Sequence, residues 1–278
     1  MKTINKILLL TDFSEVANNA TRYALNIAEL VKSEIEILHI INTPVDWLKL
    51  PLDKEKLYPE IKTEIGSAKS KLSALVMEFS KQGIIATESL VFNVAAENIS
   101  QYISEEKYDL IIMGSHGSKG IKEFAIGSNA QKVIRASQVP VLIVKTPPKS
   151  KSFSRIVMAS TFEENQIPYF KRLFNYASDL ETDIELLYIN TPYHFKETEE
   201  IEKMLSLFCE DCTKKNCGKH YIDALNEERG IQFFMSNSKA DFFAIATKGK
   251  SAISQLFSAS LTETIVNHLN IPVLVFRL

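Results

Sequence analysis

Short apolar runs alternate along the first half of the chain with longer stretches in which apolar residues recur at helical spacing. A short apolar run between turn residues predicts a buried strand of a parallel sheet. Apolar residues that recur every three to four residues predict a helix. Strands that alternate with helices along the chain predict a doubly wound α/β sheet. The predicted strands cover residues 6–11, 35–41, 89–92, 110–113 and 141–145, and the predicted helices cover residues 17–31, 54–82, 95–105 and 128–137.

The second half of the chain repeats the first. Residues 155–158 align with residues 6–9 at an offset of 149. Near the end, residues 271–275 align with residues 139–143 at an offset of 132, so the second copy is shorter in its middle. A polar, proline-containing segment over residues 146–152 separates the copies and is typical of a linker.

This self-similarity predicts two tandem domains of one fold, over residues 1–146 and 153–278. The 278 residues are 45% hydrophobic and 24% charged, which is ample material for a core. A net charge of −2 favours neither nucleic acid nor a membrane surface as a partner. The first apolar run is too short for a signal peptide and no later run could span a bilayer, so we expect a cytoplasmic protein.

One glycine-rich segment carries the candidate chemistry. It reads Gly114-x2-Gly117-x9-Gly127-Ser128, with a predicted strand before it and a predicted helix after it. Glycine lets the backbone adopt positive φ and approach a ligand closely, and the N-terminus of a helix offers free N–H groups to an anion. The segment therefore suggests a cradle for phosphate, although a long loop with three turn glycines is the simpler alternative.

The whole pattern resembles the ATP-binding loop of universal stress proteins, as do the Met-Gly-Ser-His-Gly start and the Pro-Val-Leu-Ile-Val finish. The resemblance implies strand order 3-2-1-4-5, with the ligand where that order reverses, between the first and fourth strands. By resemblance, the aspartate after the first strand contacts the adenine or ribose, apolar residues pack against the base and flank the ribose, and the glycine loop holds the phosphates. The implied ATP-binding residues are Asp12, Ile40, Met113, Gly114, Gly117, Gly127, Ser128 and Asn129.

The resemblance implies a stress-response regulator or sensor that binds ATP with Mg²⁺ in its first domain. The chain has no P-loop, dinucleotide fingerprint, nucleophile elbow or zinc-protease motif, and no general base is evident, so slow ATP hydrolysis is the most we expect. Two alternatives stay open: an ATPase or nucleotide-transfer enzyme, and a nucleotide-free module that binds a protein partner.

The second copy loses most of the site positions. Thr161 stands at the place of Asp12, Ala246 at the place of Gly114, and Ala259 at the place of Gly127. A methyl group at either glycine position would point toward the ligand. We therefore expect ATP in the first domain alone.

A cysteine cluster is particular to the second copy. It consists of Cys209, Cys212, Cys217 and His220, with paired spacings of the kind that zinc sites use. The alternatives are redox chemistry and incidental thiols at the end of a helix, since cysteine is a good buried residue. A scaffold of disulfides is not expected from three cysteines.

The last strand of each copy, residues 141–144 and 273–276, is apolar and would be a sheet edge in the implied strand order. An open apolar edge is an aggregation hazard and is normally covered. We therefore expect an intramolecular pseudo-two-fold dimer in which the two last strands lie against each other. A fragment of residues 1–146 should then form homodimers. A further homodimer of the whole chain stays open as an alternative to a monomer.

Overall fold

The computed structural model describes residues 3–93, 102–103, 107–116, 127–210, 212, 216–247 and 259–277. Its centre is one ten-stranded sheet in the order β3-β2-β1-β4-β5-β10-β9-β6-β7-β8. The strands are β1 (Lys6–Leu10), β2 (Glu34–Asn42), β3 (Ala86–Asn93), β4 (Leu110–Gly114), β5 (Val141–Val144), β6 (Arg155–Ala159), β7 (Asp183–Asn190), β8 (Cys217–Asp223), β9 (Phe242–Thr247) and β10 (Val273–Arg277).

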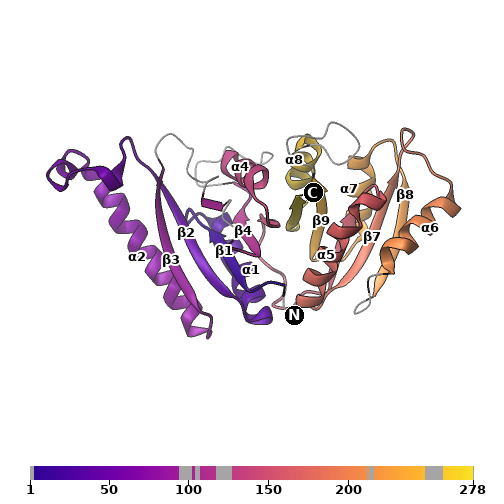
Figure 1. Cartoon of the computed structure of the whole chain (residues 1–278), viewed down its shortest axis with the longest axis horizontal. Helices are drawn as coiled ribbons and strands as arrows, with labels where there is room; N and C mark the ends of the chain where they lie inside the picture. Colours follow the sequence, from indigo (N-terminus) through magenta and orange to yellow (C-terminus); the bar gives the residue numbers. More distant parts are fainter. Residues whose placement is uncertain are drawn as a thin grey trace.

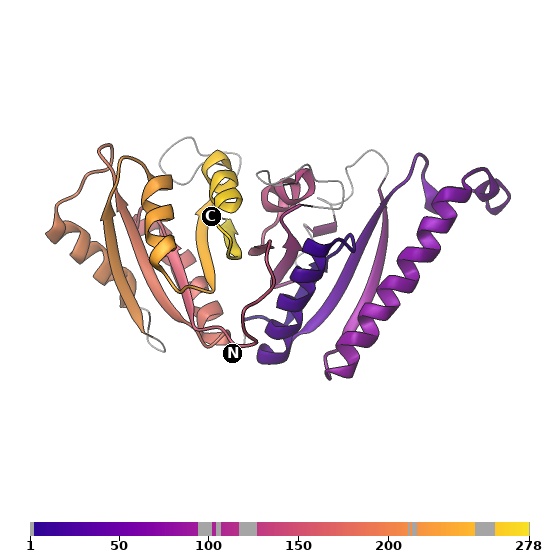
Figure 2. The same cartoon turned by 180° about the vertical axis from the view of Figure 1, so that it is seen from behind.

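Each half of the sheet has the predicted order 3-2-1-4-5, and the strands within each half are parallel. The sequence predicted two five-stranded sheets, whereas the structure joins them into one. The joint is the antiparallel pair β5 and β10, in which Leu142 lies opposite Leu274. The two halves lie side by side about this seam (Figure 1), and Figure 2 shows the same arrangement from behind. The edge that each half alone would expose is thereby paired.

Helices cover both faces of the sheet. The helices α1, α2, α5 and α6 contribute to one hydrophobic cluster, and α4, α7 and α8 contribute to the other. Each cluster contains residues from both halves, so the core is continuous across the seam. The helices are α1 (Glu15–Val31), α2 (Pro59–Lys81), α4 (Ser128–Ala136), α5 (Ile167–Asp179), α6 (Thr198–Cys209), α7 (Glu227–Asn237) and α8 (Ala259–His268), and the 3₁₀ helices are η1 (Trp47–Lys49), η2 (Leu52–Leu57) and η3 (Glu164–Gln166).

The long helix predicted over residues 54–82 begins later than expected. Residues up to Leu57 form η2, and α2 begins at Pro59. Proline has no N–H to donate and is favoured in the first turn of a helix, so it marks a start and not an interior position. Most of the helix predicted over residues 95–105 lies outside the described residues.

Side chains from both halves meet at the seam. The Tyr176 hydroxyl donates to the carbonyl of Asp109, and Thr146 Oγ1 donates to the carbonyl of Asn270 at 2.7 Å. Lys145 Nζ donates to a carbonyl of α8, and burial lowers the pKa of this lysine. The seam is therefore a packed and hydrogen-bonded part of the molecule as well as a strand pair.

Backbone geometry repeats between the halves. Phe13 has φ 62° and Phe162, at the same offset of 149, has φ 54°. The residues after the following helices, Lys32 and Glu181, have φ 54° and 56°. Non-glycine residues rarely adopt positive φ. Two matching pairs at one offset show that the strand-to-helix turn and the helix end have the same form in both halves.

Candidate functional site

The first and fourth strands bring two of the predicted site residues to one edge of the sheet. Leu10 of β1 lies opposite Met113 of β4, so Asp12 and Gly114 follow neighbouring parallel strands. Asp12 Oδ1 accepts a hydrogen bond from the backbone N–H of Ser14 at 3.1 Å, which closes the turn into α1. The order of the sheet reverses at this point, where open α/β sheets form their ligand crevice.

Gly114 lies against the start of α1. A Cβ atom built on Gly114 would be 3.0 Å from Val16 Cγ1 and 3.3 Å from the backbone nitrogen of Ala17. The glycine therefore allows β4 and the first turn of α1 to approach closely. Ser14 caps this helix, because its side chain accepts from Ala17 N, so the N-terminus of α1 is already partly satisfied.

The N-terminus of α4 differs from that of α1. Its N-cap is Gly127, which makes no side-chain capping hydrogen bond, and Ser128 and Asn129 in the first turn are exposed. The first N–H groups of a helix have no partner within the helix, and the helix dipole favours an anion there. The Gly127 N–H donates to the Ser115 carbonyl at 2.8 Å, which ties the start of α4 to the end of β4.

The reason predicted for the glycines was wrong in one respect. Gly127 has φ −60°, and Gly114 is also absent from the positive-φ residues of the described part of the chain. A side chain at position 127 would be too close to the neighbouring backbone, because a Cβ there would be 3.2 Å from the Cα of His116. Glycine at these two positions serves close approach of backbone to backbone, and not a left-handed conformation.

The apolar side of the crevice comes from β2 and β4. Ile40 is half-buried and Met113 is buried, and both pack in the same hydrophobic cluster. His39 is buried, with Nδ1 2.8 Å from the Thr11 carbonyl, so this histidine supports the turn after β1. Gly117 lies outside the described residues. The structure thus gathers Asp12, Ile40, Met113, Gly114, Gly127, Ser128 and Asn129 around the edge where β1, β2 and β4 end and α4 begins.

At the corresponding edge of the second half, a buried side chain bonds to the turn after β6. Gln166, at the position of Ala17, is 1% exposed. Its Oε1 accepts from Ser160 Oγ at 2.6 Å and its Nε2 donates to Thr161 Oγ1 at 2.9 Å. Sequence reasoning missed this glutamine, although the offset of 149 aligns it with a small residue of the first half. The second half therefore differs from the first at this edge by a larger side chain as well as by its alanines.

The four predicted zinc ligands do not come together. Cys217 and His220 both lie on β8 and are three residues apart, so their side chains point to opposite faces of the sheet. Cys217 packs with the cluster that includes α6, whereas His220 contacts Glu185 and the Phe234 ring on the α7 side. In the described part of the chain, no group of three or more His, Cys, Asp or Glu side chains could hold a metal ion. The zinc prediction assumed that the paired residues lie on a helical turn or a knuckle. Cys217 and His220 lie on a strand instead, so the zinc prediction was wrong.

Two of the cysteines form a disulfide instead. Cys209 at the end of α6 and Cys217 at the start of β8 are bonded, with their Cα atoms 5.9 Å apart. Cys212 stays a thiol and is half-buried. The expectation of no disulfide scaffold did not foresee this single bridge. It rested on sequence spacing, whereas the bridge forms because the end of α6 lies beside the start of β8.

We expect one reactive thiol per chain when the unreduced protein is unfolded in denaturant and titrated with a thiol reagent. After reduction the count should rise to three, the number of cysteines in the chain. The unreduced count depends only on the Cys209–Cys217 bond, since unfolding exposes every thiol. Three reactive thiols before reduction would show that the bond is absent.

Comparison with known proteins agrees with this architecture. A family model described as the universal stress protein family matches residues 3–145. Universal stress protein MJ0577 of Methanocaldococcus jannaschii is 33% identical over 152 residues, which cover 50% of this chain and 94% of that protein. Universal stress protein MJ0531 of the same organism is 30% identical over 145 residues, which cover 52% of this chain and 84% of that protein.

A solved structure matches the chain over its whole length. It is a universal stress protein from Archaeoglobus fulgidus, with a TM-score of 0.75, 20% identity, and coverage of 98% of each chain. This likeness extends the fold to the second half, beyond residues 3–145. None of the helices in the described ranges combines the length and hydropathy that a membrane span requires.

The fold is that of a doubly wound α/β protein whose strand order reverses between β1 and β4, the place where sheets of this kind bind ligands. With a family model over half of its residues and two relatives at 30% identity or more, the chain belongs to the universal stress protein family.

Proposed function

We propose that the chain is a stress-response regulator or sensor that binds one ATP in its first half. The observation that carries this proposal is the N-terminus of α4, which has glycine as its N-cap and lies at the edge where β1 and β4 end. Ser128 and Asn129 would hold the phosphates, and Gly127, which has no side chain, would leave room for them. Asp12 and Ile40 would contact the ribose and base, as the family resemblance implies.

Within this proposal the chain consists of two tandem domains, residues 1–146 and 153–278, of which the second is a degenerate copy. Gln166 and Ala246 support the loss of the second site, because the first half has the smaller residues Ala17 and Gly114 at these positions. The seam between β5 and β10 would take the place of a dimer interface, so that the chain is a pseudo-two-fold dimer of its own halves.

Mg²⁺ would come to the site with the nucleotide. The described residues include no cluster of three or more His, Cys, Asp or Glu side chains. Mg²⁺ is commonly held by substrate phosphates with one or two carboxylates, and not by a cage made of protein alone. Asp12 is a carboxylate at this edge.

Binding and turnover measured together test the regulator against the enzyme. We expect calorimetry to give one ATP per chain. We expect ATP hydrolysis, measured as ADP formed per chain, to be far slower than the roughly 1 s⁻¹ at the lower end of ordinary enzyme turnover. A turnover within the usual enzymatic range would favour the ATPase. Absence of ATP binding would contradict the proposal.

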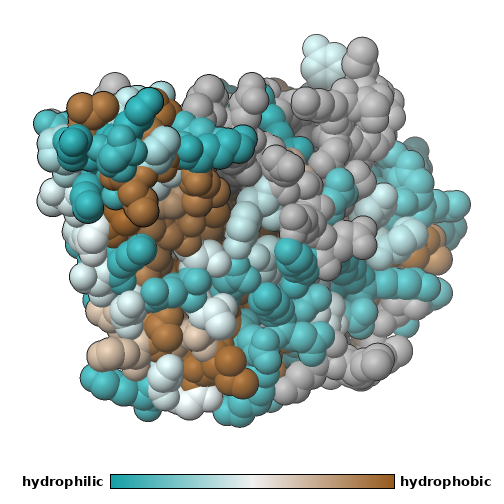
Figure 3. Space-filling model, turned by 60° about the vertical axis from the view of Figure 1, so that its left-hand side comes forward, coloured by the Kyte–Doolittle hydropathy of each residue, from teal (hydrophilic) through white to brown (hydrophobic). Residues whose placement is uncertain are grey.

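A specific surface feature favours the partner-binding alternative. Exposed apolar side chains are spread along the outer edge of the first half (Figure 3), and exposed apolar surface is a candidate for protein contacts. They come from η1, η2, α2 and the residue before β3: Leu48, Leu52, Leu57, Met77 and Ile85. A preparation that carries no nucleotide and has no affinity for added ATP would support a module that works through this surface alone.

A further inference from the structure

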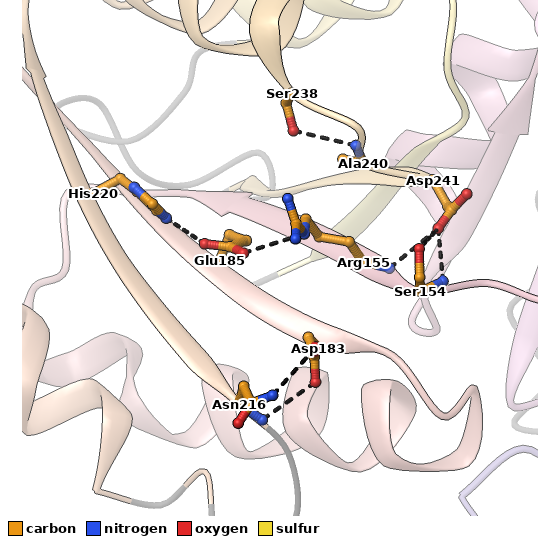
Figure 4. Close-up of polar contacts among 9 residues, drawn as sticks. All are labelled: Ser154, Arg155, Asp183, Glu185, Asn216, His220, Ser238, Ala240 and Asp241. Atoms are coloured by element: carbon orange, nitrogen blue, oxygen red, sulfur yellow. Dashed lines mark hydrogen bonds and ion pairs between the residues drawn. The ribbon is translucent and has the colours of Figure 1, made fainter.

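A row of polar side chains crosses three strands of the second half. Arg155 of β6, Glu185 of β7 and His220 of β8 lie in line, with the carboxylate between the two basic groups (Figure 4). Arg155 Nε is 3.2 Å from Glu185 Oε1, and His220 Nε2 contacts Glu185 Oε2. Both oxygens of the carboxylate are therefore engaged by the protein.

Gly218 makes this arrangement possible. It lies opposite Glu185 in the pairing of β7 with β8. A Cβ atom built on Gly218 would be 2.0 Å from Glu185 Oε2, so any larger residue would displace the carboxylate. The contact between Glu185 and His220 is thus built into the backbone of the edge strand.

The row forms the floor of a cavity of about 200 Å³ between the sheet and α7. The wall is largely apolar, and the Phe234 ring centroid lies 5.1 Å from that of His220. Phe233 is 64% exposed at the mouth. The remaining lining residues are Ile222, Asn237 and Ser238.

The first half has the corresponding salt bridge, but aromatic side chains contact both of its charged groups. Lys6 and Glu36, at the positions of Arg155 and Glu185, are 3.2 Å apart. The Tyr102 hydroxyl donates to Glu36, and the Tyr108 ring lies 5.2 Å from Lys6 Nζ.

At the offset of 132, Phe234 and Ala240 stand at the positions of Tyr102 and Tyr108. The second half therefore has neither the hydroxyl that engages the carboxylate nor the ring that covers the cation.

Two of the lining residues, Arg155 and Ser238, have hydrogen-bond donors that can reach a ligand. Among the described residues, Arg155 bonds through its backbone N–H and through Nε, which leaves both Nη groups to the cavity. Ser238 Oγ accepts from Ala240 N at 3.2 Å and still has its own proton to donate. A guanidinium fork matches a carboxylate in a bidentate way. Glu185 lies beside the same guanidinium and repels any anion, so a doubly charged phosphate is disfavoured more strongly than a singly charged carboxylate.

We propose that this cavity is a second ligand site, which binds a small carboxylic acid with an apolar body. The carboxylate would pair with the Arg155 Nη groups, and the body would pack on Ile222, Phe233 and Phe234. The cavity is smaller than the roughly 300–1,000 Å³ of sites for drug-sized ligands, so it suits a body of about one ring. The site is separate from the proposed nucleotide crevice, because Arg155 begins its strand whereas the crevice lies beyond the carboxyl ends.

Benzoate is a suitable probe, with benzyl alcohol and inorganic phosphate as comparisons, in ligand-observed NMR titrations of the full chain. We expect benzoate to bind saturably at one site, and we expect neither comparison compound to match it. Arg155→Lys should weaken benzoate binding by about tenfold or more, because an ammonium group lacks the bidentate fork. The variant should fold, since the first half has Lys6 facing Glu36.

Two matched controls separate the site from general effects. Lys6→Arg changes the corresponding position of the first half and should leave benzoate affinity unchanged. Phe233→Ala removes part of the wall and should weaken binding by about threefold or more. Phe195→Ala removes an equally exposed ring elsewhere and should have no effect.

Equal benzoate affinity in the wild-type chain and Arg155→Lys would overturn the proposal. Benzyl alcohol binding as tightly as benzoate would also overturn it, since the carboxylate would then play no part. Binding of phosphate in place of benzoate, with the same dependence on Arg155, would show a simple anion site and overturn the assignment to an organic acid.

Discussion

Gly127→Val should remove ATP binding from the chain. A Cβ at this position would already be 3.2 Å from the His116 backbone, and the two γ-methyl groups would stand at the N-terminus of α4. Losing two hydrogen bonds to charged phosphate oxygens, at about 1.5 kcal/mol each, corresponds to a fall in affinity of roughly 100-fold. Calorimetry with ATP and Mg²⁺ on the two proteins measures this directly.

Ala259→Val is the matched control, since Ala259 stands at the corresponding position of the second half. We expect this variant to bind ATP as the wild-type chain does. Circular dichroism should show both variants folded, because valine tolerates the extended backbone that Gly127 has as N-cap. Unchanged ATP affinity in folded Gly127→Val would remove the glycine loop from the proposed site.

Leu142→Asp should strongly destabilise the whole chain. Leu142 is buried and lies opposite Leu274 across the seam, within a cluster that includes residues of both halves. A carboxylate there would be buried without a partner, which costs about 4 kcal/mol or more and lowers the melting temperature by roughly 10 °C. Thermal unfolding followed by calorimetry measures the shift.

Leu52→Asp introduces the same charge at a leucine that is exposed and distant from the seam. Its melting temperature should stay within about 2 °C of the wild-type value. If the two variants melt together, the antiparallel joint of β5 and β10 does not contribute to the stability of the chain.

The fold was predictable because it follows from local patterns. The strands before Thr11 and Gly114 read as continuous apolar runs, since helices cover both faces of the sheet. The apolar final strands also predicted their own pairing, because an open apolar edge is unfavourable. The start of α2 was missed because a 3₁₀ helix precedes Pro59 and has similar spacing.

The candidate site was predictable only as far as it depends on strand ends. Asp12 and Gly114 converge because β1 and β4 are neighbours, and strand order came from the family resemblance. The side-chain details were not predictable in this way. Gln166 folds back onto Thr161 through a side-chain hydrogen bond, and the two faces of β8 separate Cys217 from His220. Spacing along a sequence does not specify such contacts until the secondary structure is known.

A crystal structure of the full chain grown with ATP and Mg²⁺ tests the central claim most directly. The proposal predicts one nucleotide per chain, with its phosphates at the N-terminus of α4 beside Gly127 and Ser128 and its base toward Ile40. It also predicts that the Gln166 side chain stays bonded to Ser160 and Thr161 in the second half. Nucleotide bound in the second half, or bound in the first half away from α4, would contradict it.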